Sequence, residues 1–408
     1  MRHRSSLKNR LAAMPNERRI LGSHQKNVSY ACAKSSSKCT KKCVLLFLVT
    51  TLALVVPYRY GREILRELGT NTHHIPPLDF ENVKKMQYPS KQITPLDPAH
   101  NFSFVHISKC AGSTWIRLFK KILKLNICPD MENGPEYTVT YQQKYGCKDA
   151  DYTLISLRSP RHHVWSQFTM CKYSTWAKNI TRNNKDFPRS GDKYEDDDVD
   201  FDSWLGHFVL MGNETHNHYE CYNPVNFQTR ALTSERRYVH DGNGGFNPNM
   251  ALAMNRQKDF DFVALVEFVH ESQCMLFYRL GNNAPPAAIS YLSKSCHCGE
   301  EYEEHQKNGT VHVQHHNMGK RSSLRDLPPA TLSKVEILTL ADSFIYVNAL
   351  KNFMDEMAWL ESDDALGRRV VCDNALKKWE LELAYLDGGH FNVTKLYRNA
   401  VIKKQQQQ

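Results

Sequence analysis

Long hydrophobic stretches are almost absent from this chain of 408 residues. The only uncharged stretch that could cross a membrane runs from Cys43 to Tyr58, so the sequence allows at most one span. Acidic residues are equally scarce before it, because Glu17 stands alone against eleven Lys and Arg residues in the first 42. The stretch is shorter than the roughly 20 residues of a typical span, so a signal-peptide core and a buried helix are competing interpretations.

The basic segment and the apolar stretch together favour an uncleaved signal anchor. A cleaved signal peptide has a short basic start and a small-x-small cleavage site, and no such site precedes Pro57. The positive-inside rule assigns residues 1–42 to a cytosolic basic tail and everything after residue 58 to the lumen. We therefore predict a single-pass type II membrane protein with one transmembrane helix at residues 43–58. A short span suits the thinner early secretory membranes.

Cysteines and glycosylation sequons agree with a lumenal domain. Nine of the twelve cysteines follow the predicted span, which in an oxidising compartment predicts up to four disulfides and at least one free thiol. Five N-x-S/T sequons also follow the span, and we expect N-glycans on some of them. Their asparagines are Asn101, Asn179, Asn213, Asn308 and Asn392.

The composition predicts one folded domain behind a linker. With 41% hydrophobic and 24% charged residues the chain is typical of globular proteins, and part of its net charge of +10 belongs to the tail. The folded part is therefore only mildly basic. Residues 59–100, rich in proline and charge, predict a stem; residues 101–400 form the predicted lumenal domain, and residues 401–408 a disordered end.

The folded part repeats one pattern, a buried strand followed by a helix. Strands that alternate with helices predict an α/β domain with a parallel sheet flanked by helices, here preceded by one transmembrane helix. The predicted strands are residues 102–107, 152–157 and 261–266, each followed by a helix, of which the second begins at Pro160 and ends near Trp176. Apolar residues recur at helical intervals again from Leu332 to Leu360.

The turn after the first predicted strand has the composition of an anion-binding loop. It spans Ser108–Thr114, and Gly112 stands at the predicted start of the helix. Backbone N–H groups and the helix dipole at such a turn point toward a bound anion, and Lys109 would add a cation. The Walker A pattern GxxxxGK[ST] is absent because the lysine precedes the glycine, which argues against a kinase or ATPase of that type. An ordinary strand–helix turn is the alternative.

The second strand–helix junction reads LISLRSPRHHVWSQF. Arg158 ends the strand, and Ser166 lies eight positions further on, about two turns into the helix. Both side chains could therefore contact one phosphate from neighbouring elements. A surface arginine and an unremarkable helical serine are the competing interpretation.

Taken together, the two junctions resemble the donor-binding segments of the Golgi carbohydrate sulfotransferases, above all those acting on heparan sulfate at 6-O and on uronic acids at 2-O. In that family a K-T-G-G-T-T loop binds the 5′-phosphosulfate of 3′-phosphoadenosine 5′-phosphosulfate (PAPS), and L-R-[DN]-P-x-x-R-x-x-S binds its 3′-phosphate. Arg158, Pro160 and Ser166 match the second segment residue by residue.

The resemblance continues downstream and covers roughly residues 101–360. Residues 226–232, NFQTRAL, resemble the family's N-x-Q-T-R-x-L, and residues 262–267, FVALVE, resemble its F-V-G-L-T-E. A helix with Asp342, Tyr346 and Phe353 resembles the family's closing D-x-x-x-Y…F segment. Four segments in the same order are far more specific than any one of them.

The resemblance implies a P-loop-like parallel sheet of the sulfotransferase type. It also implies a Golgi-membrane enzyme that transfers a sulfuryl group from PAPS to a hydroxyl of a glycan or polysaccharide, without a metal and without nucleic acid as a partner. Lys109 would also stabilise charge on the bridging oxygen in the transition state. Cys110, Ala111 and Ser159 depart from the family's residues, and Cys110 is the candidate free thiol. The implied PAPS-binding residues are Lys109, Cys110, Ala111, Gly112, Ser113, Thr114, Trp115, Arg158 and Ser166.

Histidine is absent between Ile107 and Arg161, where related enzymes carry a Glu or His that acts as general base. We therefore predict that a carboxylate activates the acceptor hydroxyl. Glu136 is the first candidate and Glu132 the second, because both lie in the polar connection before the second strand. A solvated loop acid is the alternative for each.

The remaining clusters predict no metal site. His305, His312, His315 and His316 have no partner Cys or Asp at a standard ligand spacing, and residues 315–321 could instead line the nucleotide or glycan. The acidic run at residues 195–198 favours a solvated loop over a calcium site. Cys296 and Cys298 are predicted disulfide partners of other cysteines.

Two other functions fit the same sequence. One is a membrane-tethered glycan-binding protein that keeps the fold without transfer, and the other is a protein-tyrosine sulfotransferase. The acceptor, its hydroxyl position and the oligomeric state have no readable signal in the sequence.

Overall fold

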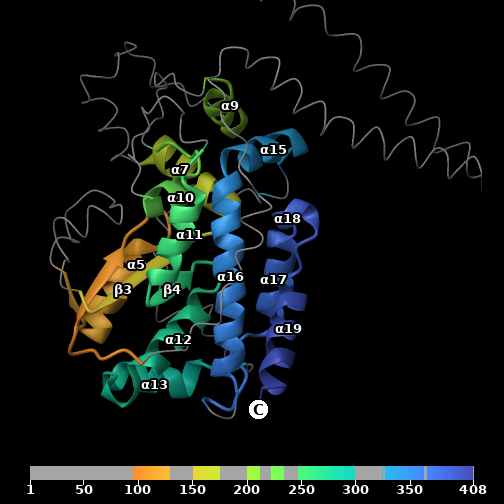
Figure 1. The fold of residues 1–408 in the computed structure, drawn as a ribbon. Helices are drawn as coiled ribbons and strands as arrows, with labels where there is room; N and C mark the ends of the chain where they lie inside the picture. The colour runs from red at the N-terminus through yellow and green to blue at the C-terminus, as the bar shows by residue number, and fades with distance from the viewer. Residues whose placement is uncertain are drawn as a thin grey trace, which may run out of the picture. The chain divides into compact units, whose positions relative to one another are not determined.

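The centre of the computed structural model is a sheet of four parallel strands in the order β2-β1-β3-β4 (Figure 1). The strands are β1 (Asn101–Val105), β2 (Asn126–Ile127), β3 (Tyr152–Leu157) and β4 (Phe262–Leu265). The predicted α/β fold with a parallel sheet is confirmed, and the short edge strand β2 was not predicted. The structure describes residues 95–128, 150–174, 200–211, 222–233, 247–298, 324, 327–362 and 365–407.

Each predicted strand is followed by a helix, as expected. After β1 comes α5 (Gly112–Arg117), which continues as a π-helical segment, η2 (Leu118–Leu123). After β3 comes α7 (Pro160–Tyr173), where proline occupies the first turn, a position in which its missing N–H costs no hydrogen bond. After β4 comes α12 (Val269–Leu280).

The helical region predicted at residues 332–360 is two helices, α15 (Pro329–Leu338) and α16 (Leu340–Leu360), with Thr339 between them. Helix α16 runs beside the sheet and contacts β4, α10, α11, α12 and α19 (Figure 1). The other helices are α9 (Phe201–Met211), α10 (Phe227–Thr233), α11 (Met250–Asp259), η5 (Gly281–Asn283), α13 (Pro286–Ser295), α17 (Asp373–Leu383), α18 (Leu386–Gly389) and α19 (Val393–Gln405).

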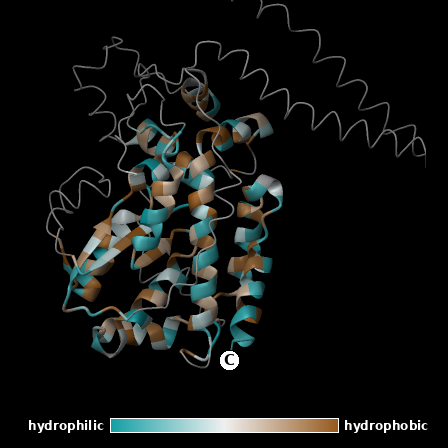
Figure 2. Cartoon of the chain, in the orientation of Figure 1, coloured by the Kyte–Doolittle hydropathy of each residue, from teal (hydrophilic) through white to brown (hydrophobic). Residues whose placement is uncertain are grey.

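Helix α16 is central because it buries residues on more than one face. Hydrophobic and hydrophilic residues alternate along it (Figure 2), and its buried side chains include Ile345, Leu350, Phe353 and Met357. These residues belong to the large core, which also contains the strands. A second, smaller core lies among α7, α9 and α15 and centres on the fully buried Trp204. Helices α12 and α16 thus pack against strand β4, while α7, α9 and α15 share the smaller core.

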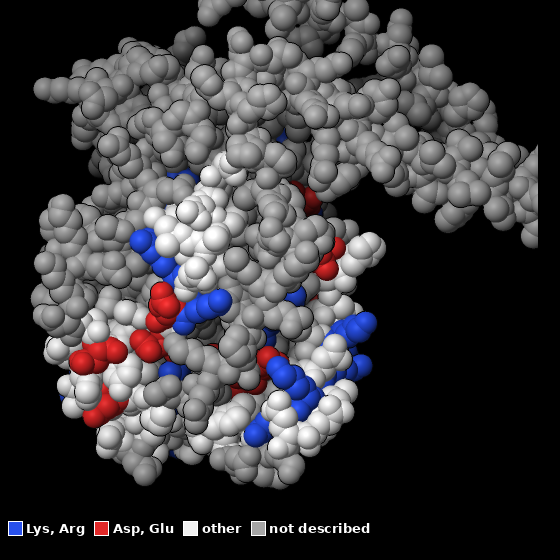
Figure 3. Space-filling view, in the orientation of Figure 1, with Lys and Arg blue, Asp and Glu red and all other residues white. Residues whose placement is uncertain are grey.

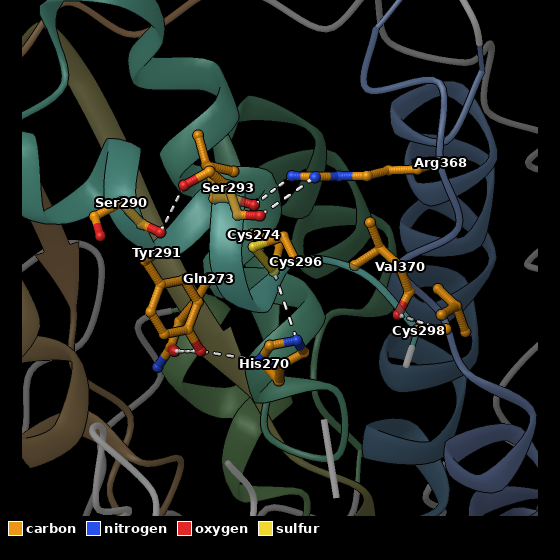
Figure 4. Close-up of a disulfide and its surroundings, with 12 residues drawn as sticks. His270, Gln273, Cys274, Ser290, Tyr291, Ser293, Cys296, Cys298, Arg368 and Val370 are labelled. Carbon is orange, nitrogen blue, oxygen red and sulfur yellow. Dashed lines mark hydrogen bonds between the residues drawn. A yellow bond between two sulfur atoms is a disulfide. The ribbon is translucent and has the colours of Figure 1, made fainter. Parts of the chain in front are cut away.

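Two disulfides stabilise the region after β4, and one of them joins it to the C-terminal part of the domain. Cys274 of α12 is bonded to Cys296, which follows α13 (Figure 4), and Cys298 is bonded to Cys372 at the start of α17. Cys296 and Cys298 therefore have separate disulfide partners, as the sequence predicted. Arg368 donates to the carbonyls of Leu292 and Ser293 beside the first disulfide (Figure 4).

Both ends of the predicted domain need correction. Leu96, placed in the stem by the sequence, is buried in the core, and its amide donates to the carbonyl of Arg279 at 2.7 Å. Helix α19 continues to Gln405, so residues 401–405 are helical and not part of a disordered end. The tail, the predicted span and stem residues 59–94 lie outside the described residues. Among the residues described, the structure has no helix with the length and apolarity to cross a membrane.

Two of the five sequons lie in the described part of the chain. Asn101 is exposed at the start of β1. Asn392 caps α19: its side-chain oxygen accepts from the amide of Lys395 at 2.7 Å, and its side-chain nitrogen donates to Glu380 at 3.0 Å. The sequons at residues 179, 213 and 308 lie outside the described residues.

A buried carboxylate on α16 caps α10. Asp342 accepts hydrogen bonds from the Thr229 amide (2.8 Å), the Thr229 hydroxyl (2.7 Å) and the Gln228 amide (3.2 Å). These amides are the donors that the first turn of a helix leaves without an intrahelical acceptor. Burial raises the pKa of Asp342 to about 6. The cap therefore depends on a carboxylate that is costly to bury.

We expect Asp342→Ala to lower the free energy of unfolding by at least about 2 kcal/mol, because it leaves three buried donors without an acceptor, each worth about 1–3 kcal/mol. Denaturant unfolding at pH 7 measures this change. The control is Asp355→Ala on the same helix, since Asp355 forms a partly exposed ion pair with Lys403 at 3.0 Å. Such pairs contribute about 0–1 kcal/mol, and equal losses in the two variants would contradict the capping role.

Candidate functional site

The carboxyl ends of β1 and β3 meet at one edge of the sheet, because these strands are adjacent and parallel. Ligands of open α/β sheets bind at this edge. The loop after β1 and the turn after β3 touch directly: Nη1 of Arg158 donates to the main-chain oxygen of Lys109 at 3.0 Å. The structure thus brings together the two segments that the sequence singled out.

Left-handed backbone conformations shape the loop after β1. Lys109 has a φ of 63° and Ala111 a φ of 59°. Gly112 is required by space, because a Cβ atom at this position would lie 1.8 Å from the His106 ring. Successive N–H groups in such a turn form a concave anion site.

Amides of this loop differ in whether they have a backbone acceptor. The amides of Thr114 and Trp115 both donate to the carbonyl of Ala111, at 3.0 and 3.1 Å. The amides of Ala111, Gly112 and Ser113 donate to no backbone carbonyl within the described part of the chain. Three consecutive amides are therefore available to a bound anion.

Several predicted ligand residues have side chains that face the core. Trp115 is fully buried, and its indole N–H donates to the Ser156 hydroxyl of β3 at 3.1 Å. Thr114 is buried, whereas Ser113 is exposed. Cys110 is buried and forms no disulfide, and its thiol donates to Oε1 of Gln228 at 3.5 Å. Trp115 therefore shapes the loop through packing.

Ser166 lies on α7, partly exposed, where its carbonyl accepts from the Thr169 hydroxyl at 3.1 Å. It stands three residues after His163, a spacing that puts two helical residues on the same face. His163 in turn contacts the loop, because its Nε2 lies 2.7 Å from the main-chain oxygen of Ser108. Ser166 is therefore near the loop side of α7.

Gln228 of α10 holds the Arg158 main chain from both sides. Its Oε1 accepts from the Arg158 amide at 2.9 Å, and its Nε2 donates to the Arg158 carbonyl at 2.8 Å. With Cys110, these contacts connect α10 to both segments of the site. The sequence analysis noted the motif at residues 226–232 without assigning this role, because the contact spans 70 positions.

Glu267, just after β4, holds the main chain of Ser159 in a similar way. Its Oε1 accepts from the Ser159 amide at 3.0 Å, and its Oε2 accepts from the Tyr346 hydroxyl at 2.8 Å. Burial, followed by the nearby Glu267 carboxylate, raises the pKa of Tyr346, so the phenol keeps its proton. The turn after β3 is thus fixed from α10 and from the end of β4.

Two histidines beside the loop, the fully buried His163 and the half-buried His106, are neutral. Burial, with a smaller contribution from Arg158 and Lys109, lowers the pKa of His163 to about 3. Burial, then Lys109, lowers the pKa of His106 to about 4. Because the Ser108 carbonyl only accepts, His163 donates from Nε2. Lys109 and Arg158 therefore supply the positive charge at this site.

The predicted bases Glu136 and Glu132 lie outside the described residues, as do the four-histidine cluster and the acidic run at residues 195–198. Among the residues that are described, no group of three His, Cys, Asp or Glu side chains could hold a metal ion. What the described site offers is cationic side chains, backbone amides and hydroxyls, which suit a ligand with several anionic groups.

Comparisons of the chain with protein-family models, with curated proteins and with solved structures found no match.

His163→Gln tests the neutral imidazole under the loop. The unfolded chain binds a proton at this histidine below its ordinary pKa of 6.5 and the folded chain does so only near 3, so stability is lost as pH falls between these values. The loss is about 1.4 kcal/mol per pH unit. Glutamine keeps an N–H donor and removes the titration, so between pH 7 and pH 5 the variant should lose about 2 kcal/mol less than wild type.

Denaturant unfolding at the two pH values measures this difference. The control is His390→Gln, because His390 is exposed just before α19. The assignment of His163 fails if its variant keeps the wild-type pH dependence.

Proposed function

We propose that this protein is a PAPS-dependent sulfotransferase that sulfates a hydroxyl of a glycan. The observation that carries the proposal is the hydrogen bond from Arg158 to the main chain of Lys109. It joins a strand–loop–helix junction and a strand–turn–helix junction that each resemble a PAPS-binding segment, on neighbouring parallel strands. Two independent segments of one donor site would have to meet in this way.

The residues present fit a donor with two separated anionic groups. The amides of Ala111, Gly112 and Ser113, with Lys109, suit the 5′-phosphosulfate, and the missing Cβ of Gly112 lets the His106 ring pack against this loop. Arg158, with Ser166 of the following helix, suits the 3′-phosphate. Arginine presents a fork of N–H donors that matches a phosphate better than a lysine does.

PAPS, when bound, supplies an activated sulfuryl group and a phosphate leaving group. The acceptor oxygen forms a bond to sulfur while the bond from sulfur to the bridging oxygen breaks, and the acceptor proton goes to a base. Lys109 would stabilise the negative charge that develops on the bridging oxygen. Positioning and cationic stabilisation supply most of the rate enhancement in the analogous phosphoryl transfer.

The base that takes the acceptor proton is proposed to be Glu136, with Glu132 as the second choice. Among the described histidines near the loop, His163 is fully buried and already donates to the Ser108 carbonyl, and the half-buried His106 packs on Phe104 and against Gly112. A base must reach the acceptor hydroxyl directly or through one water.

The acceptor is proposed to be an anionic polysaccharide. Helix α19 carries Lys395, Arg398, Lys403 and Lys404 and no acidic residue, and basic side chains gather along the edge where α17 and α19 lie (Figure 3). Such an edge attracts a polyanion. The disulfides agree with a lumenal or secreted domain, and a type II anchor in the Golgi membrane completes the proposal.

Arg158→Ala and Lys109→Ala should separate donor binding from transition-state stabilisation. Loss of the arginine removes a charge-assisted contact worth about 2–4 kcal/mol, so affinity for the product nucleotide PAP should fall roughly 30- to 1000-fold. Loss of the lysine should lower turnover more than PAP affinity, because its charge matters most in the transition state.

Calorimetry of PAP binding and transfer of label from PAPS to a panel of desulfated glycans and tyrosine peptides measure these effects. Wild-type PAP affinity in Arg158→Ala would exclude this role for the second segment. Binding of PAP without transfer to any acceptor would favour the glycan-binding alternative, and transfer only to the peptides would favour a protein-tyrosine sulfotransferase.

Glu136→Gln should lower turnover and leave PAP affinity nearly unchanged, because the carboxylate would contact the acceptor and not the nucleotide. The companion variant is Glu132→Gln, which tests the second candidate four residues earlier in the same connection. The same transfer assay and calorimetry give both quantities. Unchanged turnover in Glu136→Gln would exclude this residue as the base.

A further inference from the structure

The turn that joins β3 to α7 has its backbone donors occupied in an unusual way. The first amides of a helix ordinarily face solvent, a capping side chain or a bound anion. Ser159, the residue before α7, makes no capping bond with its own side chain. The amides of Arg158, Ser159 and Arg161 instead donate to side chains far away in sequence, and Pro160 has no N–H to donate.

Three separate elements supply the acceptors for this turn. Gln228 of α10 accepts from Arg158 at 2.9 Å, and Glu267 after β4 accepts from Ser159 at 3.0 Å. The hydroxyl of Tyr385, between α17 and α18, accepts from the Arg161 amide at 3.2 Å. Because these three amides are taken, none of them is available to an anion at this segment.

Tyr385 makes a second contact with the same residue. The Arg161 guanidinium lies 3.8 Å from the centre of the Tyr385 ring, a cation–π arrangement, and also pairs with Glu336 of α15. Burial raises the pKa of Tyr385, so the hydroxyl is protonated. Ring and hydroxyl thus fix the side chain and the main chain of Arg161 separately.

Neighbouring contacts extend this docking along α17. His162 packs edge-on against Trp379, with ring centres 5.8 Å apart, and its Nε2 lies 3.7 Å from Glu382. Its Nδ1 lies 2.8 Å from the Ser159 hydroxyl. Ser159 is fully buried, so this Ser-His-Glu arrangement has no exposed nucleophile. Its consequence is structural: α17 and the following turn are docked on the start of α7.

We propose that Tyr385 is a positioning residue that sets the direction of Arg158 by holding the first turn of α7 from the C-terminal segment. This inference rests on the proposed donor site. It makes residues 373–389, which lie beyond the segments that resemble known sulfotransferases, part of the nucleotide-binding apparatus. Arg158 stands only three residues before Arg161. A loosened Arg161 amide would therefore change the direction of the Arg158 guanidinium.

The test compares Tyr385→Phe with Tyr397→Phe in the full-length chain. Each variant loses one tyrosine hydroxyl of the C-terminal segment, since the Tyr397 hydroxyl donates to Glu361 at the end of α16. Phenylalanine keeps the ring under Arg161. The readouts are hydrogen exchange of the peptide spanning residues 157–163 and calorimetric affinity for PAP.

In Tyr385→Phe we expect faster exchange in that peptide and PAP affinity lower by about three- to ten-fold, the ordinary worth of one hydrogen bond. In Tyr397→Phe both quantities should equal those of wild type, even if the melting temperatures of the two variants match. If the Tyr385 hydroxyl were merely structural, the two variants would show the same exchange of this peptide and the same PAP affinity.

The outcomes separate this inference from the proposed function. Wild-type chain that does not bind PAP would overturn the donor site, and with it the role of Tyr385 in nucleotide binding, whatever the exchange shows. If wild type binds PAP, equal exchange of the peptide in the two variants overturns the positioning role. Faster exchange in Tyr385→Phe with wild-type PAP affinity overturns it too, because the turn would then be held without consequence for the nucleotide.

Discussion

The parallel pairing of β1 with β3 is the constraint on which the candidate site depends. Register places Val105 opposite Ile155, so the two strands deliver the loop after β1 and the turn after β3 to one edge of the sheet. The bond from Arg158 to the Lys109 carbonyl is possible only because of this placement. Each segment alone is an ordinary junction, and their adjacency brings two cationic side chains, Lys109 and Arg158, to one edge of the sheet.

Polar groups buried under this edge are costly to bury, but they define the geometry of the turn. Asp342 and Tyr346 lie one turn apart on α16, and through Gln228 and Glu267 they determine where the turn after β3 stands. Burying a carboxylate is costly unless its oxygens accept hydrogen bonds. Both oxygens of Asp342 do so. Such a network allows one arrangement of the turn and so fixes the backbone from which the Arg158 side chain extends.

The sequence predicted the elements of the fold better than their connections. Apolar runs and turn residues were sufficient for β1, β3, β4 and the helices after them, because their signals are local. Gln228, Glu267 and Tyr385 could not be assigned as partners of the turn, since each contact spans at least 70 positions. Trp115 was predicted beside the ligand from its place in the loop, yet packing decided that its ring faces the core. Leu96 was assigned to the stem because the prolines around it outweighed one apolar residue.

The cap of α19 has a consequence for the order of events in biosynthesis. The side-chain nitrogen of Asn392 that donates to Glu380 is the atom to which an N-linked sugar is attached. Sugar attachment therefore replaces one hydrogen of the nitrogen that now donates to Glu380, while the cap itself is made by the oxygen. A chain glycosylated at this sequon before α19 forms would have to build that helix with the Asn392 oxygen as its cap and a glycan standing where Glu380 is now contacted.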